Sequence, residues 1–219
     1  MEIEPKKIIL RPLLLVDTKT QLDVLKIRNE DEVKKWMYTD HKIGLDEHLN
    51  WINHLKTNNK NIVFVILNEL NITLGVVSIN EIDRLHKKAE WAYYLSKKSR
   101  GGLGSVIEFH FISFIFDFLG IDKLNCEIID GNNSVINLHK KFLFKNEGFR
   151  RSNIIKNCNR VGVHYLGLKK EEWVEGRSLI YQKYNKIFDK FNIYIDWNND
   201  NVYQNSGNLI DLKKSITTS

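Results

Sequence analysis

The stretch SRGGLGSVIEFHFISFIFDFL, residues 99–119, joins a glycine-rich turn to a long apolar segment. From Val106 onward the segment is apolar on most faces, which predicts a helix buried on all sides. A helix N-terminus leaves its first four backbone N–H groups unpaired and carries about half a positive charge, so it attracts anions. Glycine lets a phosphate approach the backbone closely. Residues 99–105 therefore predict a pyrophosphate-binding turn between a strand and a buried helix.

Two other phosphate-binding motifs fail at specific positions. A P-loop needs Lys followed by Ser or Thr after its last glycine, but Ser105 follows Gly104 directly. A dinucleotide-binding fingerprint that begins at Gly102 needs Gly or Ala at position 107, which is Ile107. A turn that only connects a strand to a helix stays open as an alternative, because a short glycine run is a weak signal.

The segments on both sides of this stretch have strand and helix patterns. Before it, three runs rich in Val, Ile, Trp and Tyr are separated by polar turns, which predicts an antiparallel meander. The expected strands are residues 8–15, 62–67, 74–82, 89–95, 123–129, 148–155 and 160–168, and the expected helices are residues 18–29, 46–56, 106–119, 132–142 and 171–188. This order predicts an α/β (α+β) fold with a central, mixed, mostly antiparallel sheet of about seven strands flanked by helices.

The chain of 219 residues fits one catalytic domain with an appendage. We expect residues 1–169 to form the domain and residues 170–219 to form a helical extension that ends in a flexible tail. Residues 198–219 are rich in Asn, Ser and Thr, which is typical of segments that fray.

Charge and cysteine content argue against nucleic acid and metal ions as partners. The net charge is +6, but the basic residues are spread among acidic ones and form no block that would follow a nucleic-acid backbone. The basic surface suits a small polyanionic ligand instead. Cys126 and Cys158 are too far apart to form a CxxC pair or a zinc knuckle, so no metal site is expected.

No segment has the pattern of a membrane anchor. The N-terminal run is interrupted by Arg11 and Pro12 and lacks a small-residue cleavage site, so it is a poor signal peptide. The apolar run 106–119 contains charged residues and is too short to cross a bilayer. We therefore expect a cytoplasmic protein that does not bind membranes.

Two motifs resemble those of the GNAT acetyltransferases. The family loop reads Gln or Arg, two variable residues, Gly, a variable residue, and Gly or Ala; Gly102 and Gly104 match it, Arg100 lies nearby, and Ser99 departs from its first position. In NNSVINLHKKFLFKNEGF, residues 132–149, Asn132 matches the family asparagine that contacts the cofactor. The resemblance covers roughly residues 7–170 and implies the GNAT fold and acetyl-coenzyme A as the acetyl donor. The cofactor-binding residues that it implies are Tyr94, Leu95, Arg100, Gly101, Gly102, Leu103, Gly104, Ser105, Asn132 and Phe142.

The N-terminal half resembles the acetyltransferases of pseudaminic acid biosynthesis that act on UDP-4-amino-4,6-dideoxy-N-acetyl-altrosamine. The matching residues are Arg28, Asn29, Trp36, Met37, Tyr38, His48 and Trp51, together with GVVSINEIDRLHKKAEW at residues 75–91. An arginine fork pairs with a diphosphate, and aromatic rings and methionine offer surfaces for uracil. Adding Tyr93 from the third meander strand, these residues are the expected sugar-nucleotide site. The alternative is that the tryptophans and Met37 pack in the core and Arg28 forms a surface ion pair.

The resemblance also implies the chemistry. His139 stands where many family members place the tyrosine that protonates the departing thiolate, and it is the expected acid. Ser78, directly or through water, is expected to help remove the amine proton, with Glu90 and Glu127 as alternative bases. A backbone N–H of residues 91–95 would stabilise the developing oxyanion.

Other readings remain open. The same fold serves acetyltransferases of ribosomal proteins and of aminoglycosides, because function lies in the acceptor site. A non-catalytic GNAT-like module that binds a nucleotide or a partner protein is a third possibility. A homodimer is compatible with all of these.

Overall fold

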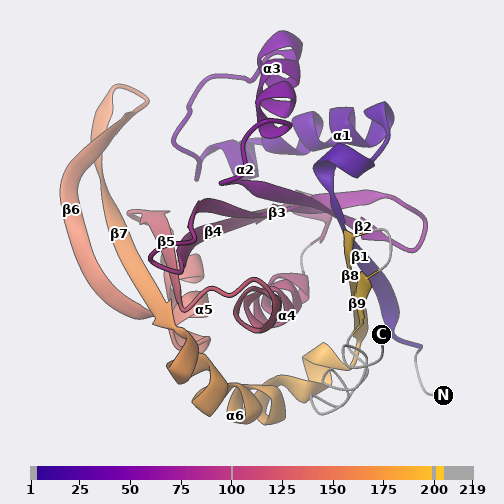
Figure 1. The fold of residues 1–219 in the computed structure, drawn as a ribbon. Coiled ribbons are helices and arrows are strands. Elements are labelled where there is room, and N and C mark those ends of the chain that lie inside the picture. The colour runs from indigo at the N-terminus through magenta and orange to yellow at the C-terminus, as the bar shows by residue number, and fades with distance from the viewer. Residues whose placement is uncertain (1–3, 100, 199–200, 205–219) are drawn as a thin grey trace.

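The computed structural model describes residues 4–99, 101–198 and 201–204. Within them the strands form a single sheet of nine strands in the order β6-β7-β5-β4-β3-β2-β1-β8-β9, with helices on both faces (Figure 1). Neighbouring strands are antiparallel except for the pairs β4–β5 and β1–β8, which are parallel. The α/β class and the mixed, mostly antiparallel sheet are confirmed. The sheet exceeds the expected seven strands because β8 and β9 follow the last expected helix.

The elements have the following bounds. The strands are β1 (Lys6–Pro12), β2 (Ile62–Asn68), β3 (Thr73–Asp83), β4 (Lys88–Leu95), β5 (Lys123–Ile129), β6 (Lys145–Lys156), β7 (Asn159–Lys169), β8 (Phe191–Asn198) and β9 (Asn201–Gln204). The helices are α1 (Thr18–Arg28), α2 (Asp31–Lys34), α3 (Leu45–Leu55), α4 (Leu103–Phe118), α5 (Asn133–Lys141) and α6 (Lys170–Phe188), and Leu13–Leu15 and Lys97–Ser99 form 3-10 turns.

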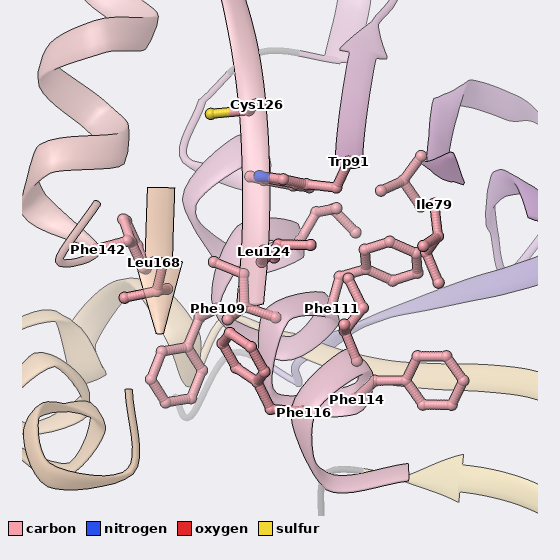
Figure 2. Packing of buried hydrophobic residues seen from close by; sticks show 14 of the residues in the cluster. Ile79, Trp91, Phe109, Phe111, Phe114, Phe116, Leu124, Cys126, Phe142 and Leu168 are labelled. Carbon is pink, nitrogen blue, oxygen red and sulfur yellow. The ribbon is translucent and has the colours of Figure 1, made fainter. Parts of the chain in front are cut away.

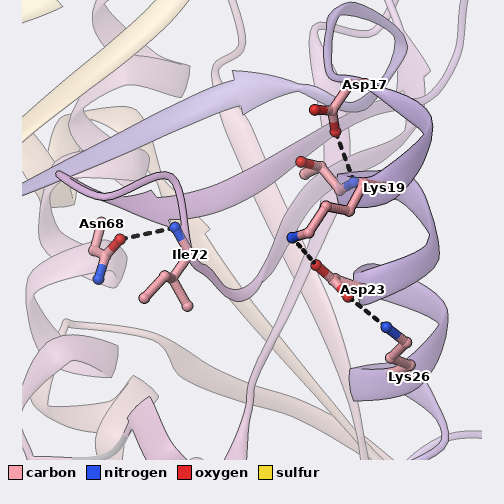
Figure 3. A network of polar contacts seen from close by, with 7 residues as sticks. Asp17, Lys19, Asp23, Lys26, Asn68 and Ile72 are labelled. Carbon is pink, nitrogen blue, oxygen red and sulfur yellow. Dashed lines mark hydrogen bonds and ion pairs between the residues drawn. The ribbon is translucent and has the colours of Figure 1, made fainter.

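Local hydrogen bonds explain where several elements begin and turn. The Asp17 carboxylate accepts a hydrogen bond from the backbone N of Thr20 at 2.7 Å, which caps α1 (Figure 3). The carboxylate of Asp23 lies between two lysines of the same helix (Figure 3). Asn68 turns β2 into β3, because its Oδ1 accepts from the backbone N of Ile72 at 2.8 Å. Helix α3 begins at Leu45 with Gly44 as its N-cap, one residue before the expected start at Asp46.

The expected meander and the buried helix are both present. β2, β3 and β4 pair antiparallel in sequence order. Helix α4 is buried along its length from Val106 to Phe116 and contributes Phe109, Phe111, Phe114 and Phe116 to the main core (Figure 2). A helix that is apolar all round needs partners on all sides, which the sheet, α6 and β8 supply.

The segment from Lys170 packs into the same core. Trp173, Ile180 and Phe188 of α6 are buried with the residues of α4, and β8 pairs parallel with β1 from Lys6 to Leu10. The two strands after α6 were not expected from the sequence. Of the tail that was expected to fray, residues 199–200 and 205–219 lie outside the described residues.

Replacing Trp173 with alanine tests whether α6 is part of the cooperative core. Its side chain is fully buried, its ring lies 5.3 Å from that of Phe109, and its Nε1 donates to Ser113 Oγ at 3.2 Å. We expect Trp173→Ala to lower the free energy of unfolding by about 3–5 kcal/mol. The measurement is urea unfolding followed by circular dichroism.

Leu179→Ala on the same helix is the matched control. Leu179 is 70% exposed, so its replacement should change the free energy of unfolding by about 0.5 kcal/mol or less. Equal effects of the two substitutions would contradict a structural role for α6.

Candidate active site

The parallel strands β4 and β5 pair only at their beginnings. Three residue pairs join them, from Lys88 opposite Lys123 to Glu90 opposite Asn125. Beyond these pairs β4 continues to Leu95 and β5 to Ile129 without pairing to each other. Along this opening β4 has no strand partner on its β5 side among the described residues, so its backbone N–H and C=O groups are a candidate ligand-binding edge.

Side chains of β4 alternate between the two faces of the sheet. Trp91, Tyr93 and Leu95 pack against the main core with α4 and α5. Tyr94 packs on the opposite face with the smaller core beneath α1 and α3. Tyr94 was expected at the cofactor and Tyr93 at the acceptor, and the structure places the two side chains on opposite faces of the sheet.

The glycine turn leads directly into α4. Gly101 and Gly102 have φ values of 114° and 96°, in the region that favours glycine, and no side chain caps the helix. A Cβ at Gly104 would lie 3.2 Å from Tyr93 Oη, and a Cβ at Gly102 would lie 3.0 Å from Ile187 of α6. Close packing therefore accounts for Gly104, whereas Gly101 is exposed to open space.

The other residues expected at this turn are placed as follows. Leu103 is buried in the core, and Ser105 is half-buried in the first turn of α4. Arg100 lies outside the described residues. Of the three glycines, Gly101 is the one that leaves its backbone open, whereas Gly102 and Gly104 pack against Ile187 and Tyr93.

Helix α5 carries the expected acid into the interior. His139 is 4% exposed, and its Nδ1 lies 2.7 Å from Oε1 of Glu108 on α4. The imidazole packs against Trp91 and Phe144, each with ring centroids 5.2 Å away. The sequence analysis missed Glu108 as a partner, although a carboxylate inside an apolar helix is a signal that could have identified it.

Asn132 and Phe142 stand at the two ends of α5. Asn132 is buried at the N-cap, where its Oδ1 accepts a hydrogen bond from Ser134 Oγ at 3.3 Å. Phe142 is 1% exposed and stacks on Tyr184 of α6 at 6.1 Å. The structure brings Asn132 and His139 to one helix beside the opening and places Phe142 in the core.

A cavity of about 370 Å³ lies on the other face of the sheet, beneath α1 and α3. It brings together four expected residues, Arg28, His48, Trp51 and Ser78, with Tyr94. Its remaining lining residues are Val24, Thr39, Ile43, Glu47, Leu55, Asn61, Val63, Val76 and Asn80. The cavity is therefore part apolar and part polar, as small-molecule sites usually are.

One terminal nitrogen of the Arg28 guanidinium is hydrogen-bonded in this cavity, and the other is not. Its Nη2 donates a hydrogen bond to Thr39 Oγ1, while its Nη1 is buried with no hydrogen-bond partner among the described residues. Burial lowers the pKa of the guanidinium, although it stays charged at neutral pH. A buried charged donor without a partner is costly, which indicates a place for an acceptor group of a ligand.

His48 contributes a neutral ring to the cavity wall. It is 4% exposed, its Nε2 lies 2.9 Å from the carbonyl oxygen of Gln21, and its ring tilts against Trp51 at 5.4 Å. Burial lowers the pKa of His48, so the imidazole is uncharged at neutral pH.

The expected residues Trp36, Met37 and Tyr38 lie on the loop after α2 rather than in the cavity lining. Tyr38 Oη donates a hydrogen bond to Glu127 of β5, and Trp36 lies near Gly131. Thr39, the next residue of this loop, does line the cavity, where its Oγ1 accepts a hydrogen bond from Arg28.

The tip of the β6–β7 hairpin holds this loop through a buried lysine. Lys156 is 8% exposed, and its Nζ donates to the carbonyl oxygens of Met37 at 2.6 Å, Lys34 at 3.2 Å and Thr39 at 3.4 Å. Figure 1 shows the hairpin curving away from the sheet toward the loop before α3. The sequence analysis missed Lys156, because its partners are 117 or more residues away.

The expected base Ser78 lies on β3 at the cavity. Its Oγ donates to the carbonyl oxygen of Ala92 at 3.4 Å and accepts from Asn80 Nδ2 at 3.0 Å. Burial and the charge of Glu127 raise the pKa of Glu90. Ser78 lies on the face of the sheet that α1 and α3 cover, and His139 lies on the opposite face. The two faces meet at the opening between β4 and β5.

A second cavity, of about 530 Å³, lies at the β3–β4 turn. It mixes acidic and basic side chains, and Glu90 is the only expected catalytic candidate among its lining residues.

No helix within the described part of the chain is long and apolar enough to span a membrane. No group of three or more potential metal ligands occurs among residues 4–99, 101–198 and 201–204.

Lys156→Met tests the role of the hairpin tip. Three carbonyl oxygens would lose their donor, and we expect the free energy of unfolding to fall by about 1–3 kcal/mol. Lys42→Met, at an exposed lysine of the same loop region, should leave stability unchanged. Chemical unfolding of both variants provides the comparison, and equal stability would contradict a clamp at Lys156.

Comparison with known proteins agrees with the observed fold. A family model described as an acetyltransferase (GNAT) domain matches residues 7–145. Spermidine N-acetyltransferase from Vibrio cholerae in complex with CoA and spermine is similar in structure, with a TM-score of 0.70, 17% sequence identity, and coverage of 76% of this chain and 98% of that chain. A dodecameric structure of spermidine N-acetyltransferase from Vibrio cholerae in an intermediate state has a TM-score of 0.64 and 16% identity over 76% of this chain and 96% of that chain.

The family match covers more than half of the chain, and it includes the glycine turn, the opening between β4 and β5, and α5. This chain belongs to the GNAT acetyltransferase family and is an acetyl-coenzyme A-dependent N-acetyltransferase.

Proposed function

We propose that the acceptor is the 4-amino group of a UDP-linked amino-dideoxy sugar. The observation that carries this proposal is Arg28, whose buried Nη1 has no partner within the described residues and lines the 370 Å³ cavity. A planar guanidinium binds phosphate oxygens through parallel hydrogen bonds. A ligand with a diphosphate would satisfy this nitrogen.

The rest of the cavity suits a nucleotide better than a polycation. Trp51 and Tyr94 offer aromatic surface for a base, and His48 is uncharged. Glu47 is the only carboxylate in the lining, and it already lies 3.0 Å from His41. A polyamine would meet Arg28 as a like charge, which disfavours binding.

Trp36, Met37 and Tyr38 extend the proposed acceptor site along the loop held by Lys156. Thr39 joins the loop to Arg28, so a ligand that engages Arg28 lies beside this loop. Tyr94 belongs to the acceptor side in this proposal, and Tyr93 to the donor side, because the sheet separates them.

The donor side is proposed to consist of the glycine turn, the first turn of α4, Asn132 and the free edge of β4. Backbone N–H groups at the start of α4 would bind the pyrophosphate of coenzyme A. A backbone N–H of β4 would bind the carbonyl oxygen of the thioester and stabilise its developing charge. Phe142 and Leu103 support this side from the core rather than by touching the donor.

His139 and Ser78, on opposite faces of the sheet, are proposed to handle the two protons of the reaction. His139 would give a proton to the departing sulfur, and Ser78, directly or through water, would help take a proton from the amine. Holding amine and thioester together in the opening would supply much of the acceleration, on the order of 7–11 kcal/mol. A homodimer and a cytoplasmic location remain predictions.

Arg28→Met should weaken the acceptor and leave the donor alone. Hydrogen bonds to charged groups contribute about 1.5–3 kcal/mol, so we expect the KM for a UDP-4-amino sugar to rise roughly 10- to 100-fold. Calorimetry should show the same loss in affinity for UDP, with acetyl-coenzyme A binding unchanged. Steady-state release of free thiol is the activity measurement.

Arg151→Met, at an exposed arginine of β6, is the control and should change none of these values. If the wild-type protein binds no UDP and spermidine supports thiol release equally in both variants, the acceptor is not a nucleotide sugar.

Gly102→Ala tests the glycine turn. With φ at 96° and Ile187 at 3.0 Å from the added Cβ, alanine is strained here and should shift the turn. Loss of one backbone hydrogen bond costs about 1 kcal/mol, so acetyl-coenzyme A should bind roughly 5- to 10-fold more weakly in calorimetry. Gly148→Ala, where the added Cβ meets nothing within 4 Å, should bind as the wild type does. Unchanged affinity in Gly102→Ala would place the pyrophosphate elsewhere.

A further inference from the structure

Glu108 is a carboxylate that no step of the proposed chemistry uses. It lies on α4 with no exposed surface, and its Oε2 has no hydrogen-bond partner among the described residues. Its Oε1 lies 2.7 Å from His139 Nδ1, across the interface between α4 and α5. Burying an ionised carboxylate costs several kcal/mol, so its position on this helix calls for an explanation.

We propose that Glu108 is a positioning residue that keeps a proton on Nε2 of His139 until the sulfur departs. The inference rests on the proposed role of His139 as the acid. Because Nδ1 is committed to Glu108, Nε2 is the ring nitrogen that is left to react. The ring packs against Trp91, the residue at which β4 parts from β5.

Charge neutrality in the buried pair fixes where the proton lies. The pair is neutral either as carboxylate with imidazolium or as carboxylic acid with neutral imidazole. In the first state both ring nitrogens carry protons. In the second state the acid O–H donates to Nδ1, so the ring proton is on Nε2. Both neutral states therefore present an N–H at Nε2.

The surroundings favour these neutral states. Burial raises the pKa of Glu108, and His139 opposes that rise. The other titratable groups that face Glu108 are Tyr93 of β4 and Cys126 of β5, and burial together with the Glu108 charge raises the pKa of both. They stay neutral at working pH, so His139 is the group that balances the Glu108 charge among the described residues.

The proton step then balances as follows. As the C–S bond breaks, the sulfur keeps the bonding electron pair and takes the proton from His139 Nε2. From the carboxylic acid state, the acid proton moves to Nδ1 at the same time. In either case Glu108 ends as a carboxylate that accepts from Nδ1–H, and the pair carries one negative charge. The amine nitrogen loses one proton to solvent by way of Ser78 or water, and solvent returns a proton to Nε2 before the next turnover.

The first test measures the proton directly and needs no acceptor. In full-length protein labelled with ¹⁵N-histidine, long-range ¹H–¹⁵N spectra report which ring nitrogens carry hydrogen. We expect His139 Nε2 to be protonated through the neutral range, with and without coenzyme A. A bare Nε2 throughout that range in the wild-type protein would overturn the proposal, whether or not any variant folds.

The second test uses Glu108→Gln, which keeps the volume and removes the charge. Thiol release with the UDP-amino sugar should show a kcat that is lower by roughly 10²- to 10³-fold, with an unchanged KM for acetyl-coenzyme A. In the ¹H–¹⁵N spectra of Glu108→Gln, the fraction of His139 rings that carry hydrogen on Nε2 should fall, because the carboxylate that fixes the hydrogen positions is gone. Glu108→Asp, which keeps the carboxylate, should restore much of the Nε2 signal.

Ser113→Ala is the matched control on the same helix. Ser113 is buried and accepts from Trp173, away from His139, so its loss should leave kcat and the imidazole signals unchanged. If Glu108→Gln behaves like Ser113→Ala, Glu108 has only a structural role. If the imidazole signals respond as expected but a nucleotide sugar is not acetylated, the acceptor assignment fails and the role of Glu108 stands.

Discussion

The separation of β4 from β5 is the constraint on which the rest of the site depends. Adjacent parallel strands normally continue to exchange hydrogen bonds, but here three residue pairs end at Glu90 and Asn125. β4 remains fixed by β3, which pairs with it antiparallel as far as Leu95, and β5 remains fixed by β7 as far as Ile129. Each strand is therefore rigid on one side and unpaired on the other. A free backbone edge held in place in this way is preorganised to bind a polar ligand.

Several charged or polar groups are kept buried around this opening, although each of them costs stability. Glu108 and His139 pair on one face, while Arg28 and Lys156 lie on the other. Apolar residues of similar volume could stand in place of such groups with little loss in the free energy of folding. Lys156 is satisfied by three carbonyl oxygens, whereas Arg28 and Glu108 each keep one atom, Nη1 and Oε2, without a hydrogen-bond partner among the described residues. Of these two groups, Arg28 is the one that lines the cavity.

Sequence reasoning succeeded where the signal is local. The glycine turn, the apolar helix α4 and the meander follow from residue type and period alone, and their observed bounds differ little from those expected. Strand β8, with the sequence FNIYIDWN, was missed although its residues alternate as in a strand, and its place in the sheet depends on pairing with β1 at the other end of the chain. Alternation along a strand predicts that Tyr93 and Tyr94 face opposite ways, but which of them faces α4 depends on tertiary packing. The contact between Glu108 and His139 joins residues 31 apart through the packing of two helices.

The two faces of the sheet carry different parts of the proposed site. Strand β4, the glycine turn and α5 lie on the side that the family motifs describe, and α1, α3 and the loop after α2 lie on the side where the motifs are silent. Spermidine acetyltransferases share the fold at 16–17% identity, so most side chains on the acceptor face are free to differ. The charge of Arg28 in that cavity selects between ligands. It repels a polycation and attracts a diphosphate. In the proposed function, the opening between the strands is where acetyl transfer takes place, and the charge beneath α1 and α3 selects the amine that reaches it.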